Sequence, residues 1–212
     1  MKINVLSDLH IENGEYNFPI IPSDLLVLAG DICQINKKEL LVNFLKTIPS
    51  NQRTIMVLGN HEYLYADHNQ CEFNMRIILN DFPQITLLEN ESIIIDDIEF
   101  IGSTLWTNFL AHGQEYYLAS KEFIQKHWTP ENAFIIENNQ KINLTVDFAE
   151  QKSHIALNYL ENKLNYKHNG KRVVISHFPP TKLSTELAYI NDKLNSYWIN
   201  DFDYLFKDIS LW

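Results

Sequence analysis

Polar side chains that can bind metals follow three apolar runs in the first third of the chain, at the point where each run ends. The runs are Lys2–Ser7, Leu25–Ala29 and Thr54–Leu58. The polar residues that follow them are Asp8 and His10, then Asp31, then Asn60 and His61. Carboxylate and amide oxygens together with imidazole nitrogens suit Mn, Fe or Zn. Because the ends of neighbouring strands can meet at one sheet edge, we expect one polar site there.

Each of these short motifs also has an ordinary structural explanation. Asp8 and His10 are two residues apart and share one face of an extended backbone, as two ligands of one metal require, but they could equally form a solvated strand end. Asp31 could be a turn residue or a helix cap. His61 could be a buried histidine with satisfied hydrogen bonds. The ordered set therefore carries more information than any single motif.

A fourth apolar run ends in the same way near the C-terminus. Residues 172–175 read as a strand, and they are followed directly by Ser176 and His177. Two prolines after Phe178 predict an extended exit from this strand. His177 is therefore a further candidate ligand.

The elements that must position these residues are predicted from hydrophobic periodicity. Leu25–Ala29 shows no polar alternation, which is typical of a strand buried on both faces. Residues 37–48 place leucines, a phenylalanine and an isoleucine at helical spacing before Pro49, which predicts an amphipathic helix. This strand–helix–strand order favours parallel strands with right-handed crossovers.

The remainder of the chain gives weaker signals. We predict a helix that ends near residue 82, a short strand at 87–88, and a hairpin whose turn is Asp96-Asp97. Residues 108–170 are predicted to form a helical cap or outer layer, with a helix start at Thr129-Pro130 and a helix over 146–164. A helix over 197–206 and the beginning of a strand at 208–212 complete the prediction.

Composition and charge exclude several classes of protein. The 212 residues are 45% hydrophobic and 12% aromatic, which supports a substantial core. The net charge of −10 argues against a nucleic-acid footprint. No apolar stretch is long enough to span a bilayer, and no signal peptide is recognisable. Two cysteines form no disulfide framework, so a cytoplasmic protein is expected.

Together the motifs resemble those of the calcineurin-like metallophosphoesterases. The motifs are Asp8-Leu9-His10, Gly30-Asp31, Gly59-Asn60-His61-Glu62 and Ser176-His177, in that family's order. The resemblance covers nearly the whole chain. It implies an α/β (α+β) fold, a four-layer αββα sandwich with mixed sheets, in which residues 1–212 form a single domain. A Rossmann-type oxidoreductase is disfavoured, since the first strand is not followed by a glycine-rich turn.

The resemblance also implies a reaction and a role for each residue. A hydroxide activated by two divalent metals would hydrolyse a small phosphate mono- or diester. The implied roles are first-metal ligands for Asp8 and His10, a bridging ligand for Asp31, second-metal ligands for Asn60 and His177, and a catalytic acid for His61.

Two departures from the family's pattern leave alternatives open. Phe178 stands where the family often has a second histidine, which is expected to change the pocket wall. The family's C-terminal Gly-His-x-His motif is absent, so each metal would lack one ligand and the fold would be incomplete at its C-terminus. Impaired activity, a non-catalytic remnant that binds one metal, a phosphate or no metal, and a homo-oligomer formed through an exposed C-terminal sheet edge are the alternatives.

Overall fold

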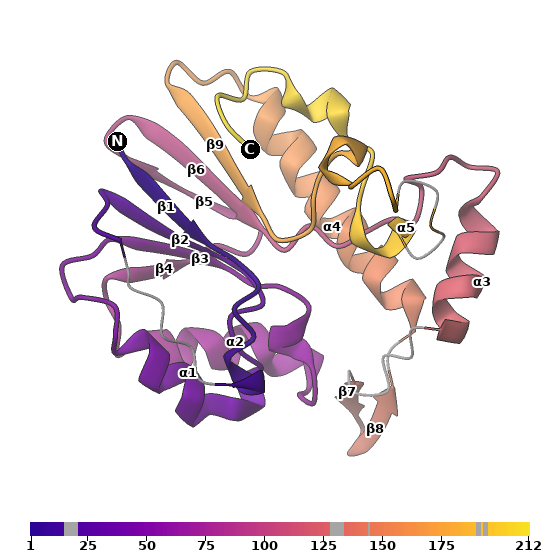
Figure 1. The fold of residues 1–212 in the computed structure, drawn as a ribbon, viewed down its shortest axis with the longest axis horizontal. Coiled ribbons are helices and arrows are strands. Elements are labelled where there is room, and N and C mark those ends of the chain that lie inside the picture. The colour runs from indigo at the N-terminus through magenta and orange to yellow at the C-terminus, as the bar shows by residue number, and fades with distance from the viewer. Residues whose placement is uncertain (15–20, 128–133, 144, 190–191, 193–194) are drawn as a thin grey trace. The chain divides into compact units, whose positions relative to one another are not determined.

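The computed structural model describes residues 1–14, 21–127, 134–143, 145–189, 192 and 195–212. By its internal contacts the chain divides into two compact units. The first unit comprises Met1–Glu89 and Asn132–Asn143, and the second comprises Asn90–Glu131 and Leu144–Trp212. Each unit has its own sheet and its own helices (Figure 1).

The first unit is built on a sheet of four parallel strands in sequence order. The strands are β1 (Ile3–Leu6), β2 (Leu25–Ala29), β3 (Thr54–Val57) and β4 (Ile85–Leu87). Every residue of β2 and β3 is buried, as expected for strands covered on both faces. The predicted parallel arrangement of the first three strands is confirmed. The short strand predicted at 87–88 is found slightly earlier, at Ile85–Leu87.

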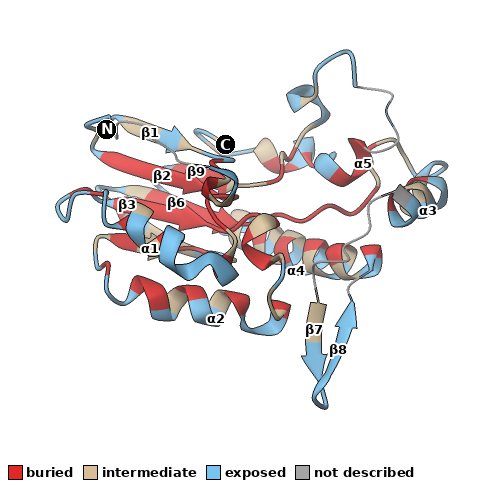
Figure 2. Ribbon diagram, turned by 60° about the horizontal axis from the view of Figure 1, so that its bottom comes forward, coloured by how far each residue is buried: buried red, intermediate tan, exposed pale blue. Residues whose placement is uncertain are grey.

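Two helices, α1 (Lys38–Leu45) and α2 (His68–Leu79), lie on the same side of this sheet (Figure 1). The inner face of α2 buries Cys71, Met75 and Ile78, whose spacing of four and three residues gives one apolar stripe (Figure 2). The Asp67 side chain caps α2 by accepting a hydrogen bond from the backbone N–H of Asn69 at 3.1 Å. The unit also contains three short 3₁₀ turns. Turn η1 (Ile11–Asn13) follows β1, η2 (Ile35–Lys37) precedes α1, and η3 (His61–Tyr63) follows β3.

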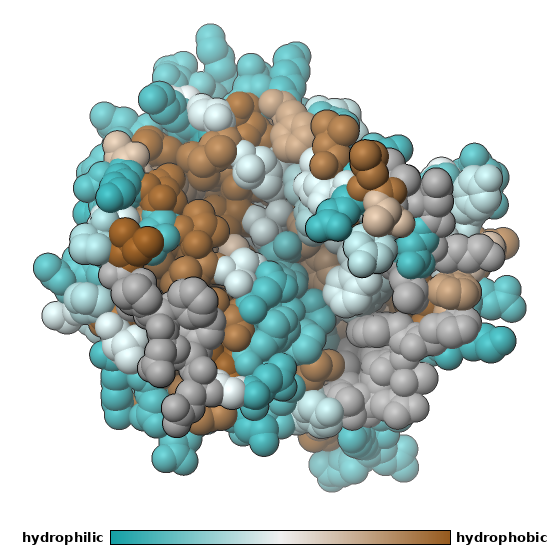
Figure 3. All heavy atoms as spheres, viewed as in Figure 1, coloured by the Kyte–Doolittle hydropathy of each residue, from teal (hydrophilic) through white to brown (hydrophobic). Residues whose placement is uncertain are grey.

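A small hairpin in the first unit lies within residues 108–170, which were predicted to form a helical cap or outer layer, and this part of the range is not helical. Strands β7 (Phe134–Glu137) and β8 (Gln140–Asn143) pair antiparallel around Asn138 and Asn139, whose φ angles are 50° and 61°. Two consecutive residues with positive φ form the hairpin turn that suits right-handed strand twist, and asparagine tolerates that conformation. The Asn-Asn pair was therefore an overlooked turn signal. The tip of the hairpin is hydrophilic on the face seen in Figure 3.

The second unit contains a mixed sheet of three strands. Strands β5 (Glu91–Ile95) and β6 (Ile98–Ser103) form the predicted antiparallel hairpin, and both Asp96 and Asp97 in its turn have positive φ. Strand β9 (Lys171–Ser176) pairs parallel with β6. The predicted strand before His177 is thereby confirmed.

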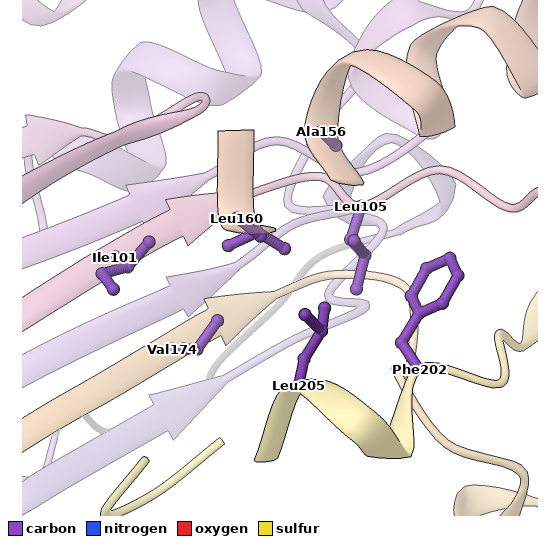
Figure 4. Packing of buried hydrophobic residues seen from close by; sticks show 7 residues of the cluster. All are labelled: Ile101, Leu105, Ala156, Leu160, Val174, Phe202 and Leu205. Carbon is purple, nitrogen blue, oxygen red and sulfur yellow. The ribbon is translucent and has the colours of Figure 1, made fainter. Parts of the chain in front are cut away.

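Helix α4 (Val146–Asn165) packs against this sheet through a core of apolar side chains. Leu160 and Ala156 of α4 lie against Ile101 and Val174 of the sheet, and the C-terminal segment adds Phe202 and Leu205 (Figure 4). The helix predicted over residues 146–164 is confirmed. Helix α3 (Tyr117–His127) lies earlier in the same region, and the predicted helix start at Thr129-Pro130 lies outside the described residues.

An ion-pair cluster joins the same helix to strands β6 and β9. The Glu99 carboxylate on β6 is buried and lies 2.9 Å from Arg172 Nε on β9 and 2.7 Å from Lys163 Nζ on α4. Burial acts to raise the pKa of Glu99, but the hydrogen bonds from Lys163 and Arg172 outweigh it and the pKa is lowered. This carboxylate therefore remains charged.

The single helix predicted over residues 197–206 is wrong. The structure instead has a short helix α5 (Asn195–Trp198) and a 3₁₀ turn η5 (Asp203–Phe206). Between them, the backbone N–H groups of Asn200 and Phe202 donate to the carbonyls of Pro179 and Pro180, at 3.1 and 2.8 Å. Those donors cannot also bond within a continuous helix, so the tertiary contact ends it.

The outer edge of β9 carries backbone hydrogen bonds from the last residues of the chain. Ser210 N–H donates to the Arg172 carbonyl at 2.8 Å, and Val174 N–H donates to the Leu211 carbonyl at 2.9 Å. The predicted beginning of a strand there corresponds to this isolated bridge. Self-association through a sheet edge stays a prediction.

The fold class is confirmed. The described residues form a mixed α/β structure with one parallel sheet, one mixed sheet, a separate hairpin and five α-helices. None of the described helices has both the length and the apolar character that crossing a membrane requires.

Candidate metal centre

The ends of β1 and β2 are joined by backbone hydrogen bonds that continue past the strands. Asp8 N–H donates to the Gly30 carbonyl at 3.1 Å, and His10 N–H donates to the Asp31 carbonyl at 3.0 Å. Asp8, His10 and Asp31 have φ angles of 54°, 45° and 53°, in the left-handed region that residues with a Cβ seldom occupy. Such strain is concentrated at functional sites, where the surrounding structure enforces it.

The end of β3 approaches Asp31 so closely that only glycine fits at position 59. A Cβ on Gly59 would lie 2.2 Å from Asp31 Oδ1 and 2.6 Å from the Asp31 nitrogen. Immediately beyond, the backbone N–H of His61 donates to Asp31 Oδ1 at 2.8 Å. The glycine thus brings the backbone of the third strand end against the carboxylate of the second.

Glu62 stabilises this close approach. Its side chain is fully buried and accepts hydrogen bonds from four backbone N–H groups. Oε2 accepts from Asp31 at 3.0 Å and from Gly59 at 2.7 Å, and Oε1 accepts from Ile32 at 2.7 Å and Cys33 at 3.3 Å. The last residue of the Gly-Asn-His-Glu string is therefore structural, because it ties the β2 and β3 ends together.

Four predicted site residues converge at the ends of these strands. His10 Nε2 lies 3.9 Å from Asp8 Oδ1 and 3.7 Å from Asp31 Oδ2, and His61 Nε2 lies 4.0 Å from Asp31 Oδ2. These separations are too long for direct hydrogen bonds. An ion about 2.0–2.2 Å from each of two ligand atoms can join atoms that are up to about 4.2 Å apart. The predicted ligands Asp8, His10 and Asp31 therefore fit a divalent metal, and His61 lies beside them.

The electrostatic state of Asp31 supports the same conclusion. Burial raises the pKa of this carboxyl from its ordinary 3.8 to about 6, and the negative charge of Asp8 contributes, against the opposing effects of the His61 N–H and the two imidazoles. A buried carboxylate whose charge is poorly compensated by the protein is stabilised by a bound cation. Asp31 is thus suited to bind metal.

The two remaining predicted ligands are Asn60 and His177. Asn60 is buried next to His61, and its backbone carbonyl accepts a hydrogen bond from the Tyr63 N–H at 3.3 Å. His177 follows β9 in the second unit. The roles assigned to both as ligands of the second metal remain predictions, as do the roles of the other site residues.

Phe178, which follows His177, packs inside the second unit. Its ring centroid lies 5.5 Å from that of Trp106 and 5.8 Å from that of Tyr197, and the side chain is buried. The residue that replaces a second histidine is therefore part of an aromatic cluster.

Sequence reasoning missed Glu12. Its side chain is 3% exposed, and Oε1 lies 3.4 Å from Nδ1 of both His10 and His61. The available signal was its position two residues after His10, which continues the Asp-x-His alternation to Asp-x-His-x-Glu.

The fold and this centre together define a metallophosphoesterase-like protein, and comparison with known families agrees. The family model described as calcineurin-like phosphoesterase matches residues 1–207, so the chain belongs to that family. The match spans both compact units, and the expectation of a single domain remains a prediction.

The individual proteins that the chain resembles share less than 30% of its sequence. Uncharacterized protein L509 of Acanthamoeba polyphaga mimivirus is 28% identical, over 94% of this chain and 78% of its own length. UPF0046 protein K07C11.7 of Caenorhabditis elegans is 27% identical over 49% of this chain and 39% of its own length. Among solved structures, the phosphopantetheinyl hydrolase (PptH) from Mycobacterium tuberculosis has a TM-score of 0.63 at 15% identity, covering 94% of this chain and 75% of that one. This likeness shows that the fold is shared.

Proposed function

We propose that the chain is a metal-dependent hydrolase of small phosphate mono- or diesters. The observation that carries the proposal is the Asp31 carboxyl, which is buried, has a raised pKa and faces the Nε2 atoms of two imidazoles. Membership of the calcineurin-like phosphoesterase family supports it. Two divalent ions, when bound, would supply an activated water and neutralise charge on the phosphoryl oxygens.

The residues have distinct tasks in this proposal. Asp8 and His10 would hold the first ion, Asp31 would be a ligand of both, and Asn60 with His177 would hold the second. His61 is the acid: its Nε2 gives a proton to the leaving oxygen while the ring is held through Nδ1. The hydrogen bond from the His61 backbone N–H to the Asp31 carboxylate holds the His61 backbone in place, and this limits where its ring can lie.

The proposal is tested by hydrolysis of an aryl phosphomonoester and an aryl phosphodiester with added Mn²⁺. Asp31→Ala should abolish metal-dependent turnover, because it removes the bridge. Asp81→Ala is the matched control, since it removes an exposed carboxylate that follows α2. It should leave turnover unchanged.

A second variant separates binding from chemistry. His61→Ala should reduce turnover but retain the metal stoichiometry of the wild type, measured by equilibrium dialysis. If His61→Ala releases metal as Asp31→Ala does, His61 is a ligand and its assignment as the acid is wrong. A wild-type chain that binds metal but hydrolyses neither ester would instead favour a non-catalytic descendant of the family.

A further inference from the structure

Glu12 lies where one carboxylate can contact both histidines of the centre. Oε1 is 3.4 Å from His10 Nδ1 and 3.4 Å from His61 Nδ1, and the two rings meet edge to face with centroids 4.3 Å apart. These distances are longer than a strong hydrogen bond, as is common at catalytic sites before ligands assemble. One oxygen can accept from both rings, because a carboxylate oxygen has two lone pairs.

The opposite nitrogens of the same rings face the bridging carboxylate. His10 Nε2 lies 3.7 Å and His61 Nε2 lies 4.0 Å from Asp31 Oδ2. Each imidazole therefore lies between Glu12 on its Nδ1 side and Asp31 on its Nε2 side. A neutral imidazole carries one proton, so a hydrogen bond from Nδ1–H to Glu12 leaves the lone pair on Nε2.

The burial of Glu12 supports a role for its carboxylate in hydrogen bonding to these two rings. Its side chain is 3% exposed, and within the described part of the chain its second oxygen, Oε2, is buried without a hydrogen-bond partner. Burying a polar atom without a partner opposes folding. An apolar side chain of similar size would fill this space without that cost, so packing does not explain a glutamate here.

We propose that Glu12 is a shared positioning residue that holds both His10 and His61 in the Nδ1–H form, with Nε2 turned toward the metal centre. This inference rests on the proposed function for its catalytic meaning. For His10, the arrangement presents a lone pair for metal binding. For His61, the acid is the cationic ring, which is protonated on both nitrogens. Its Nε2–H gives a proton to the leaving oxygen, and the neutral Nδ1–H form held by Glu12 is the ring that remains. Substitution of a carboxylate that orients a metal-bound histidine commonly lowers metal affinity or activity by about 10- to 100-fold.

The direct test is the tautomer of each ring in the metal-free protein, read from nitrogen-15 and proton correlations of labelled histidine at a pH above the ordinary imidazole range. Wild-type His10 and His61 should both carry the proton on Nδ1. In Glu12→Leu, which fills the space but accepts no hydrogen bond, both should shift toward Nε2–H. Glu12→Gln keeps a carbonyl acceptor and should restore the Nδ1–H form in part. His154 is exposed on α4 in the second unit and serves as the internal control.

The second readout is metal affinity and turnover. Glu12→Leu should bind Mn²⁺ about 10- to 100-fold more weakly than the wild type and have a lower kcat, and Glu12→Gln should recover part of both. Unchanged tautomers in Glu12→Leu would overturn the proposal. So would a titration with Zn²⁺ in which the Nδ1 signals respond instead of the Nε2 signals, because His10, Glu12 and His61 would then be metal ligands themselves. A wild-type chain without esterase activity would refute the proposed function, but the tautomers and the metal affinity would still decide the role of Glu12.

Discussion

Replacing the Asp31 carboxylate by its amide should stabilise the metal-free protein and abolish its proposed activity. Burial, with a smaller contribution from the Asp8 charge, raises the pKa of Asp31 from 3.8 to about 6. The folded state therefore binds more protons than the unfolded state between these values, and stability falls as the pH rises through that window. Each pKa unit corresponds to about 1.4 kcal/mol, so the ionised carboxylate costs about 3 kcal/mol above pH 6.

Asp31→Asn removes this charge and keeps the shape. An asparagine oxygen can still accept the 2.8 Å hydrogen bond from His61 N–H. Asparagine also tolerates the φ of 53° better than most residues do. We expect the variant to be more stable than the wild type by up to about 3 kcal/mol at pH 8, and the difference to disappear below about pH 4.

Urea unfolding of both metal-free proteins at pH 4, 6 and 8 is the assay. Added Mn²⁺ should stabilise the wild type, because it binds only the folded state, and should have little effect on Asp31→Asn. A variant that is less stable than the wild type at pH 8 would refute the electrostatic reasoning. So would a difference of the same size at every pH.

Three further substitutions test how the centre and its surroundings are held together. Glu62→Gln replaces one acceptor oxygen by a donor and leaves two buried N–H groups without an acceptor, so unfolding free energy in urea should fall by about 2–5 kcal/mol; a change under 1 kcal/mol would contradict this. Gly59→Ala should push the Asp31 backbone away and lower Mn²⁺ affinity in calorimetry, whereas Gly14→Ala, where a Cβ would meet nothing within 4 Å, should not. Glu99→Ala leaves Arg172 buried without its carboxylate and should cost about 3–5 kcal/mol. Because the pKa of Glu99 is lowered, its contribution is present at neutral pH and is lost on acidification, the reverse of Asp31, and equal losses at pH 7 and pH 3 would contradict the assignment.

The elements that the sequence predicts well are those with strong local patterns. The all-apolar run Leu25–Ala29 predicted a buried strand, and the Asp96-Asp97 turn between apolar runs predicted its hairpin. The ordered motifs also identified Asp8, His10, Asp31 and His61, which the fold brings together.

What the sequence did not reveal depends on tertiary contacts. The contact of Glu12 with His61 spans 49 residues, and the contacts of Glu62 with Asp31 and Ile32 span about 30, so local sequence patterns do not indicate them. The break between α5 and η5 arises from hydrogen bonds to Pro179 and Pro180, which helical periodicity cannot indicate. The β7–β8 hairpin was missed for a different reason, since its Asn138-Asn139 turn signal was present and was not recognised.

The most direct test of the central claim is turnover of aryl phosphate esters by wild type and Asp31→Asn, each measured with chelator and with Mn²⁺. Because Asp31→Asn is expected to be folded and more stable, a loss of activity cannot be attributed to unfolding. The account predicts Mn²⁺-dependent hydrolysis by the wild type, and activity at the chelated level for the variant. Metal-dependent turnover that survives in Asp31→Asn would show that the chemistry does not pass through this carboxylate and would contradict the account.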